Sequence, residues 1–387
     1  MLHQATLSER VQRPTSVTID LTAIAHNFHS LRQITGDAKM MCILKANAYG
    51  HGLIRIATFL EKLGADYFGV AYLEEGIMLR EAGIKTPILV MGGIIGDQIP
   101  LFLEYDLTIT ASSVDKLHLI EACARELNKE AKVHLKIDTG MERIGIHYYN
   151  ADSLIEASFK CKYTIIEGIF SHLANADEGD DHYSKLQIER FNKVLDVYSS
   201  NAKRPKYIHL SNSAGIVSLP SAKYNMARVG IMLYGISPSA SIAEQTSLDL
   251  QPALSWTTRV VYFKVVKPDH PVSYGSNWST SKLTRIITLP VGYGDGYMRA
   301  MSGKAQIMLH GKKYPVVGNI CMDQMMVDIG WDSGYNGDKV YLIGGTGENA
   351  VAVENLAEWA GTIPYEILTN INTRVPRQYI NDSSLIT

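Results

Sequence analysis

The chain has 387 residues, of which 46% are hydrophobic and 20% charged, and its formal net charge is −2 at pH 7. This length suits two domains, or one large barrel with an appendage. No basic run is long enough to indicate nucleic-acid binding, and no stretch approaches the ~18 consecutive apolar residues of a membrane-spanning helix. We therefore expect an ordinary globular protein that works neither on nucleic acid nor in a membrane.

The cysteines indicate the redox environment. They are widely spaced, and none forms a C-x-x-C pair: Cys42, Cys123, Cys161 and Cys321. This spacing argues against a zinc ribbon or a redox motif and fits a reducing cytoplasm. The polar residues 1–13 contain no apolar segment of the kind that a signal peptide requires. We expect a cytoplasmic protein without a metal centre.

Strand and helix signals alternate through the first part of the chain. Helices are predicted over 21–32, where Asp20 can cap the first turn, over 53–63 and 73–82, and up to Ala124. Short apolar or alternating runs predict strands at 17–20, 40–44, 67–71, 88–91, 107–110, 133–138, 165–170, 207–210 and 226–230. The alternation repeats about eight times over roughly 230 residues, which favours a (β/α)8 TIM-like barrel over an open sheet.

The pattern changes near residues 237–241, a loop-like stretch. Beyond it, strand-like runs separated by turn signals predominate, at 255–265, 284–289, 305–309, 312–317 and 340–343. One helix is predicted among them, over 353–359. We therefore predict an α/β barrel of residues 14–244, followed by a mainly β C-terminal domain of residues 245–387.

Polar residues stand where the predicted barrel strands end. They are Lys45, Asp138, His172, Ser213 and Arg228. In a parallel barrel the carboxyl ends of the strands open at one mouth, where ligands bind. These side chains are therefore expected to share a single site.

Lys45 has the clearest chemical signal of the five. It follows the apolar run 40–44 and precedes a turn with two glycines, Gly50 and Gly52. A lysine at the end of a buried strand is partly desolvated, so its pKa falls and a neutral amine becomes available. A neutral amine is what an aldehyde needs to form a Schiff base. A surface lysine after a core strand would give the same pattern, and periodicity alone does not separate the two interpretations.

The octapeptide from Lys45 to Gly52, Lys-Ala-Asn-Ala-Tyr-Gly-His-Gly, resembles the pyridoxal-phosphate lysine motif of bacterial alanine racemases. Other segments resemble this family in the same order, namely 138–145, 227–235, 272–276, 291–297 and 319–324, and the resemblance extends from about Pro14 to Tyr379. It implies a fold-type III enzyme that interconverts L-alanine and D-alanine with pyridoxal 5'-phosphate and supplies D-alanine for peptidoglycan.

The resemblance also implies a homodimer with shared active sites. Its two catalytic bases would be Lys45 and Tyr274, the latter supplied by the partner subunit. Tyr274 lies in the segment Val-Ser-Tyr-Gly-Ser, and without the resemblance an exposed hairpin tyrosine would be unremarkable.

The cofactor-binding residues that the resemblance implies are Lys45, Tyr49, His172, Ser213, Arg228, Gly230, Ile231 and Tyr365. Arg228 resembles the arginine that faces the pyridine nitrogen, although a core ion pair would also satisfy an arginine in so apolar a segment. A guanidinium keeps its proton, so the ring nitrogen would stay unprotonated and the ring would be a weaker electron sink. His172 would support Arg228, and the phosphate would be bound by hydroxyl groups and backbone N–H groups of the remaining residues.

Three residues are implied to contact the substrate. Arg143 resembles the arginine that meets the substrate carboxylate, a group that a guanidinium fork binds well. Met322 would crowd the substrate side chain, and Tyr293 would narrow the entrance. Lys136 matches a lysine that is often carbamylated in this family, and a carbamate would place an anion beside Arg143. An unmodified lysine at a strand end is the alternative.

The chain departs from the family pattern at a few positions. Glu142 stands where the family usually has glycine, which affects the local geometry around Arg143. Asn319 replaces a more common arginine, a change expected to affect the channel to the site rather than the chemistry. Asp177 and Arg299 match positions in that channel.

Three rival functions share parts of this pattern. A broad-specificity amino-acid racemase would share nearly all of it and would be expected to have a roomier pocket and a signal peptide. A basic amino-acid decarboxylase would be expected to place an acidic residue where Arg228 stands. A non-enzymatic pyridoxal-phosphate carrier would lack residues 245–387.

Overall fold

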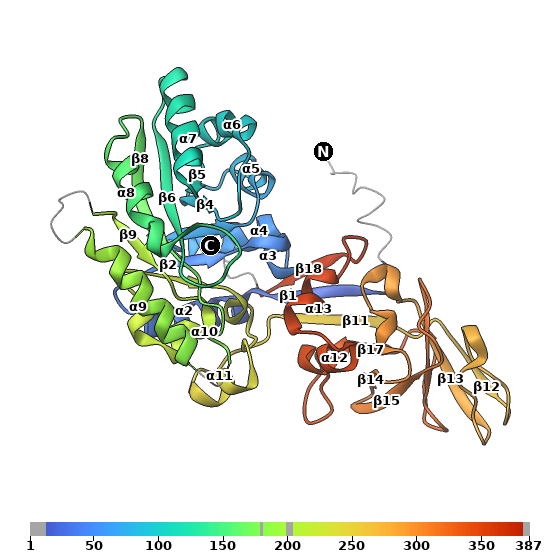
Figure 1. Ribbon diagram of the computed structural model, residues 1–387. Coiled ribbons are helices and arrows are strands. Elements are labelled where there is room, and N and C mark those ends of the chain that lie inside the picture. Colours follow the sequence, from blue (N-terminus) through green and yellow to red (C-terminus); the bar gives the residue numbers. More distant parts are fainter. Residues whose placement is uncertain (1–12, 179–180, 199–203, 382–387) are drawn as a thin grey trace. The chain divides into compact units, whose positions relative to one another are not determined.

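The computed structural model describes residues 13–178, 181–198 and 204–381. These residues form two compact units (Figure 1). One unit comprises Ala23–Gln251, and the other combines the described residues up to Thr22 with those from Pro252 onward. The chain therefore changes unit after Gln251 rather than after residue 244, and the segment before Ala23 belongs with the C-terminal part.

The first unit is built on a nearly closed parallel sheet. Among its described residues, eight parallel strands follow the order β10-β2-β3-β4-β5-β6-β8-β9. Their bounds are β2 Lys39–Ile43, β3 Tyr67–Val70, β4 Ile88–Val90, β5 Thr108–Ala111, β6 Ala131–Asp138, β8 Thr164–Phe170, β9 Tyr207–His209 and β10 Met226–Val229, with the short β7 Ile146–His147 beside β6. The Arg228 N–H of β10 donates to the carbonyl of Ser211, two residues after β9, over 3.3 Å. The predicted barrel is thus confirmed.

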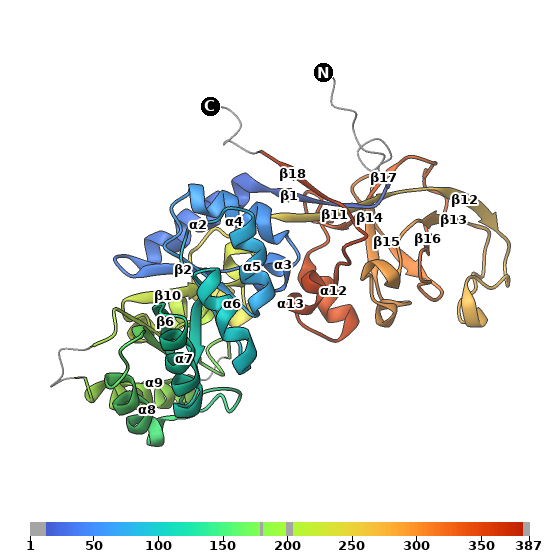
Figure 2. The ribbon, with the colours of Figure 1, turned by 90° about the horizontal axis from the view of Figure 1, so that it is seen from above.

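Helices follow the barrel strands and surround the sheet (Figure 2). Their bounds are α2 Leu21–Thr35, α3 Lys45–Tyr49, α4 Leu53–Lys62, α5 Leu73–Glu81, α6 Ile99–Glu104, α7 Val114–Glu126, α8 Ala151–Phe159, α9 His182–Asp196, α10 Ser213–Ser218 and α11 Ala240–Gln245. The buried side of α4 shows why these segments fold as helices: Ile56, Ala57 and Leu60 recur at helical spacing and pack inward. The helices therefore bury the outer face of the sheet and leave the strand ends open for a site.

The first predicted strand belongs to the other unit. β1 (Ser16–Asp20) pairs antiparallel with β11 (Leu254–Arg259) and parallel with β18 (Arg377–Ile380). The strand itself was predicted correctly, but its place as the first barrel strand was wrong. The barrel strands β3 and β5 are buried at every position, whereas β1 alternates between buried and half-buried residues. Such alternation is typical of a sheet that packs one face on the core and exposes the other face to solvent.

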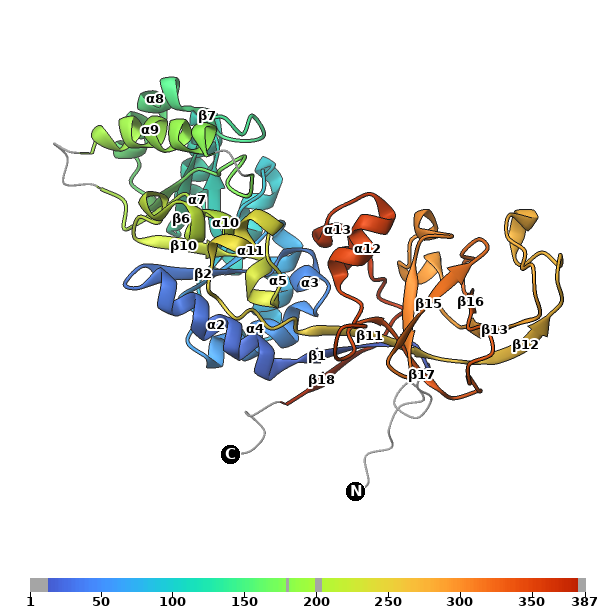
Figure 3. The same cartoon turned by 90° about the horizontal axis from the view of Figure 1, so that it is seen from below.

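The second unit is mainly β, as predicted. Its sheet follows the order β12-β13-β16-β15-β14-β17-β11-β1-β18. Figure 3 shows β1, β11 and β18 side by side in this sheet. The remaining strands are β12 Tyr262–Val266, β13 Thr284–Leu289, β14 Gln306–Leu309, β15 Lys312–Val317, β16 Met325–Asp328 and β17 Lys339–Ile343. Tight turns connect them, and these turns carry the residues that the sequence links to function.

Two helices, not one, interrupt the second unit in the described residues: α12 Val353–Ala360 and α13 Pro364–Asn370. The missed helix begins at a proline, which is favoured at the first helical position because its missing N–H would have no partner there. No helix in the described part of the chain combines the length and the apolar character needed to cross a membrane.

Candidate active site

Lys45 opens an unusual turn at the carboxyl end of β2, the element α3, whose backbone is not that of a right-handed helix. The four residues after it, 46–49, all adopt left-handed backbone conformations, with φ values of 53°, 56°, 53° and 51°. For residues other than glycine this conformation costs roughly 1–2 kcal/mol each. The predicted turn is confirmed, but its strain means that surrounding contacts must hold it in place.

Two side chains, Glu75 and Asn47, hold this turn. The Ala46 N–H donates to Oε1 of Glu75 over 2.7 Å, and Oδ1 of Asn47 accepts the Leu53 N–H over 2.8 Å. The other oxygen of Glu75 accepts the Ala71 N–H over 2.8 Å at the start of α5. Glu75 therefore links the Lys45 turn to the turn after the neighbouring strand β3. Glu75 was not among the residues predicted from the sequence.

The Lys45 amine lies among other cations. Burial lowers its pKa, the Arg143 and Arg228 cations lower it further, and the Glu75 carboxylate opposes them. This direction agrees with the expected availability of a neutral amine.

Arg228 lies in β10 with its side chain buried. Its guanidinium donates to the Ser171 and Leu210 carbonyls over 2.9 and 2.8 Å. It also contacts Nδ1 of His172 at 3.0 Å and Nδ1 of His209 at 2.9 Å. Within the described residues it forms no ion pair with a carboxylate, so the alternative of a core ion pair is wrong.

A chain of imidazoles continues from Arg228. Since a guanidinium only donates, Nδ1 of His209 must accept and its proton must reside on Nε2. That proton is then donated to Nδ1 of His134, 2.9 Å away. Burial, and then the charge of Arg228, hold the pKa of His209 well below its ordinary value and lower that of His134 to about 3. Both rings are therefore neutral, and they fix the orientation of Arg228.

His134 and His209 were missed as site residues. Each lies in a strand whose residues are mostly buried, and a polar side chain in such a strand was the available signal. Gly168 leaves room for the His134 ring, because a Cβ there would lie 2.5 Å from it. Phe170 stacks on His209 with ring centroids 4.7 Å apart.

Asp138 shapes the loop that carries Arg143. Its Oδ1 accepts the Gly140 and Met141 N–H groups over 2.7 and 3.0 Å, and its Oδ2 accepts the Arg143 N–H over 3.2 Å. Glu142 adopts a left-handed conformation with a φ of 53°, which explains why glycine would suit this position. The Arg143 side chain is left exposed.

Lys136 is buried in β6, with Nζ 3.2 Å from the Ile137 carbonyl and 4.9 Å from the centre of the Phe170 ring. Burial, followed by the Arg228 charge, lowers its pKa to about 7, while Asp138 opposes the shift and Arg143 adds to it. A buried amine with a pKa of about 7 is partly charged and partly neutral at neutral pH.

Three of the predicted phosphate-binding residues lie together. The Gly230 N–H donates to Oγ of Ser213 over 2.8 Å. A Cβ on Gly230 would lie 3.0 Å from the Tyr49 hydroxyl and 3.5 Å from Oγ of Ser213, so glycine keeps this space open. Ile231 begins the short 3₁₀ helix Ile231–Tyr234 directly after it. This cradle of hydroxyl and N–H groups is suited to an anion.

The predicted residues of the second unit lie on exposed turns. Tyr274 begins a short 3₁₀ turn, Tyr274–Ser276, and is 74% exposed. Nδ2 of Asn319 donates to the Tyr274 carbonyl over 2.6 Å, and Oγ of Ser273 donates to the Asn319 carbonyl over 2.6 Å. The expectation that Asn319 affects only the channel is therefore incomplete, because Asn319 also holds the turn of Tyr274.

The remaining predicted residues of this unit lie at exposed positions or in short helices. Tyr293 and Met322 are 42% and 53% exposed, and Tyr365 lies in α13. Arg299 begins the 3₁₀ helix Arg299–Met301, while Asp177 belongs to the first unit.

A parallel barrel with a lysine, a buried arginine and an anion cradle at its strand ends defines an enzyme with a barrel-mouth active site. Residues 19–238 match the family described as alanine racemase, N-terminal domain, and residues 253–379 match alanine racemase, C-terminal domain. The chain belongs to the alanine racemase family. It is thus an enzyme of the isomerase class.

Named relatives cover almost the whole chain. The alanine racemase of Carboxydothermus hydrogenoformans is 43% identical over 95% of this chain and 100% of its own length. That of Halothermothrix orenii is 40% identical over 97% of this chain and 99% of its own. Among solved structures, the alanine racemase of D-cycloserine-producing Streptomyces lavendulae has a TM-score of 0.93 at 32% identity, covering 97% of this chain and 99% of its own. The alanine racemase of Clostridium difficile 630 has a TM-score of 0.90 at 36% identity, with coverage of 96% and 97%.

Proposed function

We propose that this enzyme interconverts L-alanine and D-alanine with pyridoxal 5'-phosphate as its cofactor. The observation that carries the proposal is the pairing of Lys45, an amine with a lowered pKa, with Arg228, a buried cation whose partners are all neutral. The names of the relatives support the reaction, and a C. difficile alanine racemase has been solved in complex with cycloserine.

The residues of the first unit fit this cofactor. Arg143 lowers the pKa of Lys45, Lys136 and Arg228, and Arg228 lowers that of both lysines, so an anionic ligand would relieve the repulsion in this group. The cradle of Tyr49, Ser213 and Gly230 would hold the phosphate, together with the Ile231 N–H and the hydroxyl of Tyr365. When bound, the cofactor supplies an aldehyde that condenses with amines and a ring that draws electrons from the substrate Cα.

Arg228 would face the ring nitrogen and keep it unprotonated. Burial, followed by Arg143, lowers the pKa of Arg228 only to about 9, so it remains a cation at neutral pH. His172 and His209 accept from the guanidinium and hold its orientation. Because an unprotonated ring withdraws electrons less strongly, the proton at Cα would be returned quickly, which favours racemisation over transamination.

Inversion at Cα needs two groups that act on opposite faces. A single base would remove and return the proton on the same side. We assign Lys45 to the face of D-alanine and Tyr274 to that of L-alanine. We propose that Tyr274 reaches the site of a partner subunit in a homodimer, as the family resemblance implies.

The remaining polar residues would bind and orient the substrate. Arg143 would bind the alanine carboxylate with its exposed guanidinium fork. Lys136 would carry a carbamate, because its pKa of about 7 leaves much of the amine neutral and able to react with carbon dioxide. Met322 would exclude longer side chains, and Tyr293 would narrow the entrance. The product D-alanine would serve peptidoglycan synthesis in the cytoplasm.

Circular dichroism of L-alanine solutions tests the proposal. The purified enzyme with pyridoxal phosphate should bring the signal to zero, the value of an equal mixture of enantiomers, and cofactor removal should abolish this change. A persistent signal with the loaded enzyme, or release of carbon dioxide, would contradict the proposal. Comparable turnover of serine or lysine would instead favour a broad-specificity racemase.

A further inference from the structure

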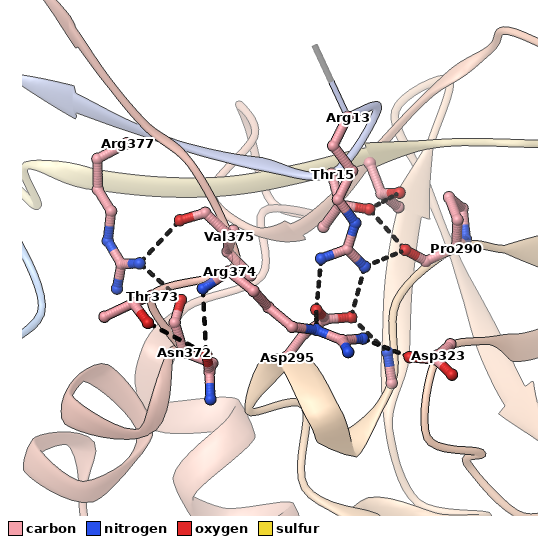
Figure 4. Close-up of polar contacts among 12 residues, drawn as sticks. Arg13, Thr15, Pro290, Asp295, Asp323, Asn372, Thr373, Arg374, Val375 and Arg377 are labelled. Carbon is pink, nitrogen blue, oxygen red and sulfur yellow. Dashed lines mark hydrogen bonds and ion pairs between the residues drawn. The ribbon is translucent and has the colours of Figure 1, made fainter. Parts of the chain in front are cut away.

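The second unit contains a buried carboxylate that the reaction does not use. The Asp295 side chain is fully buried and bonds both terminal nitrogens of Arg13, at 2.5 and 2.7 Å. Nε of Arg374 donates to it over 2.6 Å, and the Gly292 N–H donates over 3.1 Å. Figure 4 shows the two guanidinium groups converging on this carboxylate from separate segments of the chain.

This ion-pair network continues to the residue after Met322. Arg374 also donates to Asp323 over 2.5 Å, so two carboxylates and two guanidinium groups form one neutral network (Figure 4). Arg13 comes from the segment before β1, and Arg374 from the segment before β18. The network therefore joins both ends of the described chain to the loop that contains Asp295.

The same loop carries Tyr293 and is bonded to the segment that carries Met322. The Tyr293 N–H donates to the Cys321 carbonyl over 3.0 Å, and the Gly294 N–H donates to the Met322 carbonyl over 2.9 Å. The two backbones approach closely at Gly292, where a Cβ would lie 2.1 Å from the Cys321 oxygen. A shift of the Asp295 loop would therefore move Tyr293 and Met322 together.

The connection extends to the proposed base. Asn319, three residues before Met322, holds the Tyr274 carbonyl through its side chain and accepts the Ser273 hydroxyl through its own carbonyl. Segment 319–323 thus contacts the Asp295 network at one end and the Tyr274 turn at the other.

Asp295 is the buried member of this network, whereas the side chains of Arg13, Arg374 and Asp323 are 28%, 41% and 61% exposed. A buried charge of this kind is a poor source of net stability, because its desolvation offsets its attraction to its partners. Removing the Asp295 charge nevertheless takes from Arg13 and Arg374 the carboxylate that both guanidinium groups share. Such a network is well suited to fixing geometry. We propose that Asp295 is a positioning residue that holds Tyr274, Tyr293 and Met322 in their working arrangement. This inference rests on the proposed function of those three residues.

Hydrogen exchange at the alanine Cα in D2O, followed by proton NMR, tests the inference. Asp295→Asn in the holoenzyme should slow exchange of L-alanine by roughly tenfold or more, because small displacements of a base are costly. Exchange of D-alanine should change much less, since Lys45 lies on the other unit. A general loss of folded enzyme would lower both rates equally, and an equal loss would overturn the inference.

Asp66→Asn is the matched control. Asp66 also bonds two cations, Arg32 at 2.5 Å and Lys39 at 2.7 Å, but it lies in the first unit. Asp66→Asn should leave the ratio of the L-alanine and D-alanine exchange rates unchanged. If Asp295→Asn does not fold, Arg374→Gln removes the links of Arg374 to Asp295 and Asp323 from a side chain that is 41% exposed, and Arg374→Lys should recover part of the L-alanine rate.

Amide hydrogen exchange of the unliganded protein gives a second readout. Asp295→Asn should speed amide exchange in segments 292–297 and 319–323, whereas unchanged exchange there would overturn the inference. Tyr274→Phe separates this result from the proposed function. If Tyr274→Phe slows the α-hydrogen exchange of both alanine enantiomers equally, the assignment of Tyr274 as a base fails. The amide exchange alone then decides whether Asp295 positions segments 292–297 and 319–323.

Discussion

The Ala46 N–H donates a 2.7 Å hydrogen bond to Oε1 of Glu75, and this bond joins the residue after Lys45 to the start of a neighbouring helix. The bond matters because residues 46–49 are strained in the left-handed region. A carboxylate at this position satisfies backbone N–H groups from two turns and places a negative charge near the Lys45 amine.

Replacing Glu75 by glutamine should weaken cofactor binding by ~10-fold. An amide has one acceptor oxygen, so one turn would lose its acceptor, and an unsatisfied N–H costs about 1–3 kcal/mol. Titration of the unliganded protein with pyridoxal phosphate, followed by absorbance, measures this change. Glu74→Gln, at an exposed neighbouring position, is the control, and equal affinities for the two variants would refute the role of Glu75.

Replacing Arg228 by glutamate should slow racemisation and raise the yield of pyruvate from transamination. A carboxylic acid can share its proton with the ring nitrogen and so strengthen the electron sink. The change also removes the donor for the Ser171 and Leu210 carbonyls, so the melting temperature should fall. Product analysis gives the partition between D-alanine and pyruvate. Arg228→Lys keeps the cation and should keep the partition, and an unchanged partition in Arg228→Glu would mean that Arg228 does not control the ring nitrogen.

The Lys136 carbamate should depend on pH. Only a neutral amine reacts with carbon dioxide, and the pKa of Lys136 is lowered to about 7. The carbamate signal in NMR with isotope-labelled carbon dioxide should therefore grow as the pH rises through about 7. It should be absent in Lys136→Met, and its absence from the wild-type enzyme at about pH 8 would show that Lys136 stays unmodified.

The lowered pKa of Lys136 also makes the stability of the folded protein depend on pH. An unfolded lysine titrates near 10.4, so between about pH 7 and pH 10 the unfolded chain binds more protons than the folded one. Lys136 therefore makes the free energy of unfolding rise with pH in this window. Denaturant titrations should show a flatter pH dependence for Lys136→Met.

Mixed dimers test the shared site. A Lys45→Ala chain and a Tyr274→Phe chain should each be nearly inactive, whereas their heterodimer should recover activity because one of its two sites keeps both bases. The recovered rate should scale with the fraction of heterodimer. Verified heterodimers without activity would indicate that each subunit supplies both bases to its own site.

The sequence predicted the barrel because strands and helices alternate with a regular period. It could not assign β1 to a sheet, since the pairing of β1 with β11 and β18 joins segments from opposite ends of the chain. The expected residues Lys45, Arg143 and Arg228 were brought to one site because they follow or end parallel strands.

The contacts that hold these residues were harder to predict. Glu75 contacts Ala46 across 29 positions, and Asp295 contacts Arg13 across 282. No local pattern marks such pairs, because a carboxylate on a helix or in a loop is usually solvated. His134 and His209 were more accessible to prediction, as polar residues within buried strands.

Exchange of the α-hydrogen in D2O tests the two-base account most directly. Tyr274→Phe should still exchange the α-hydrogen of D-alanine, because Lys45 remains on that face. It should exchange that of L-alanine far more slowly, by about 10²–10⁴-fold, the usual contribution of a general base. Equal exchange of the two enantiomers by this variant would mean that Tyr274 is not the second base.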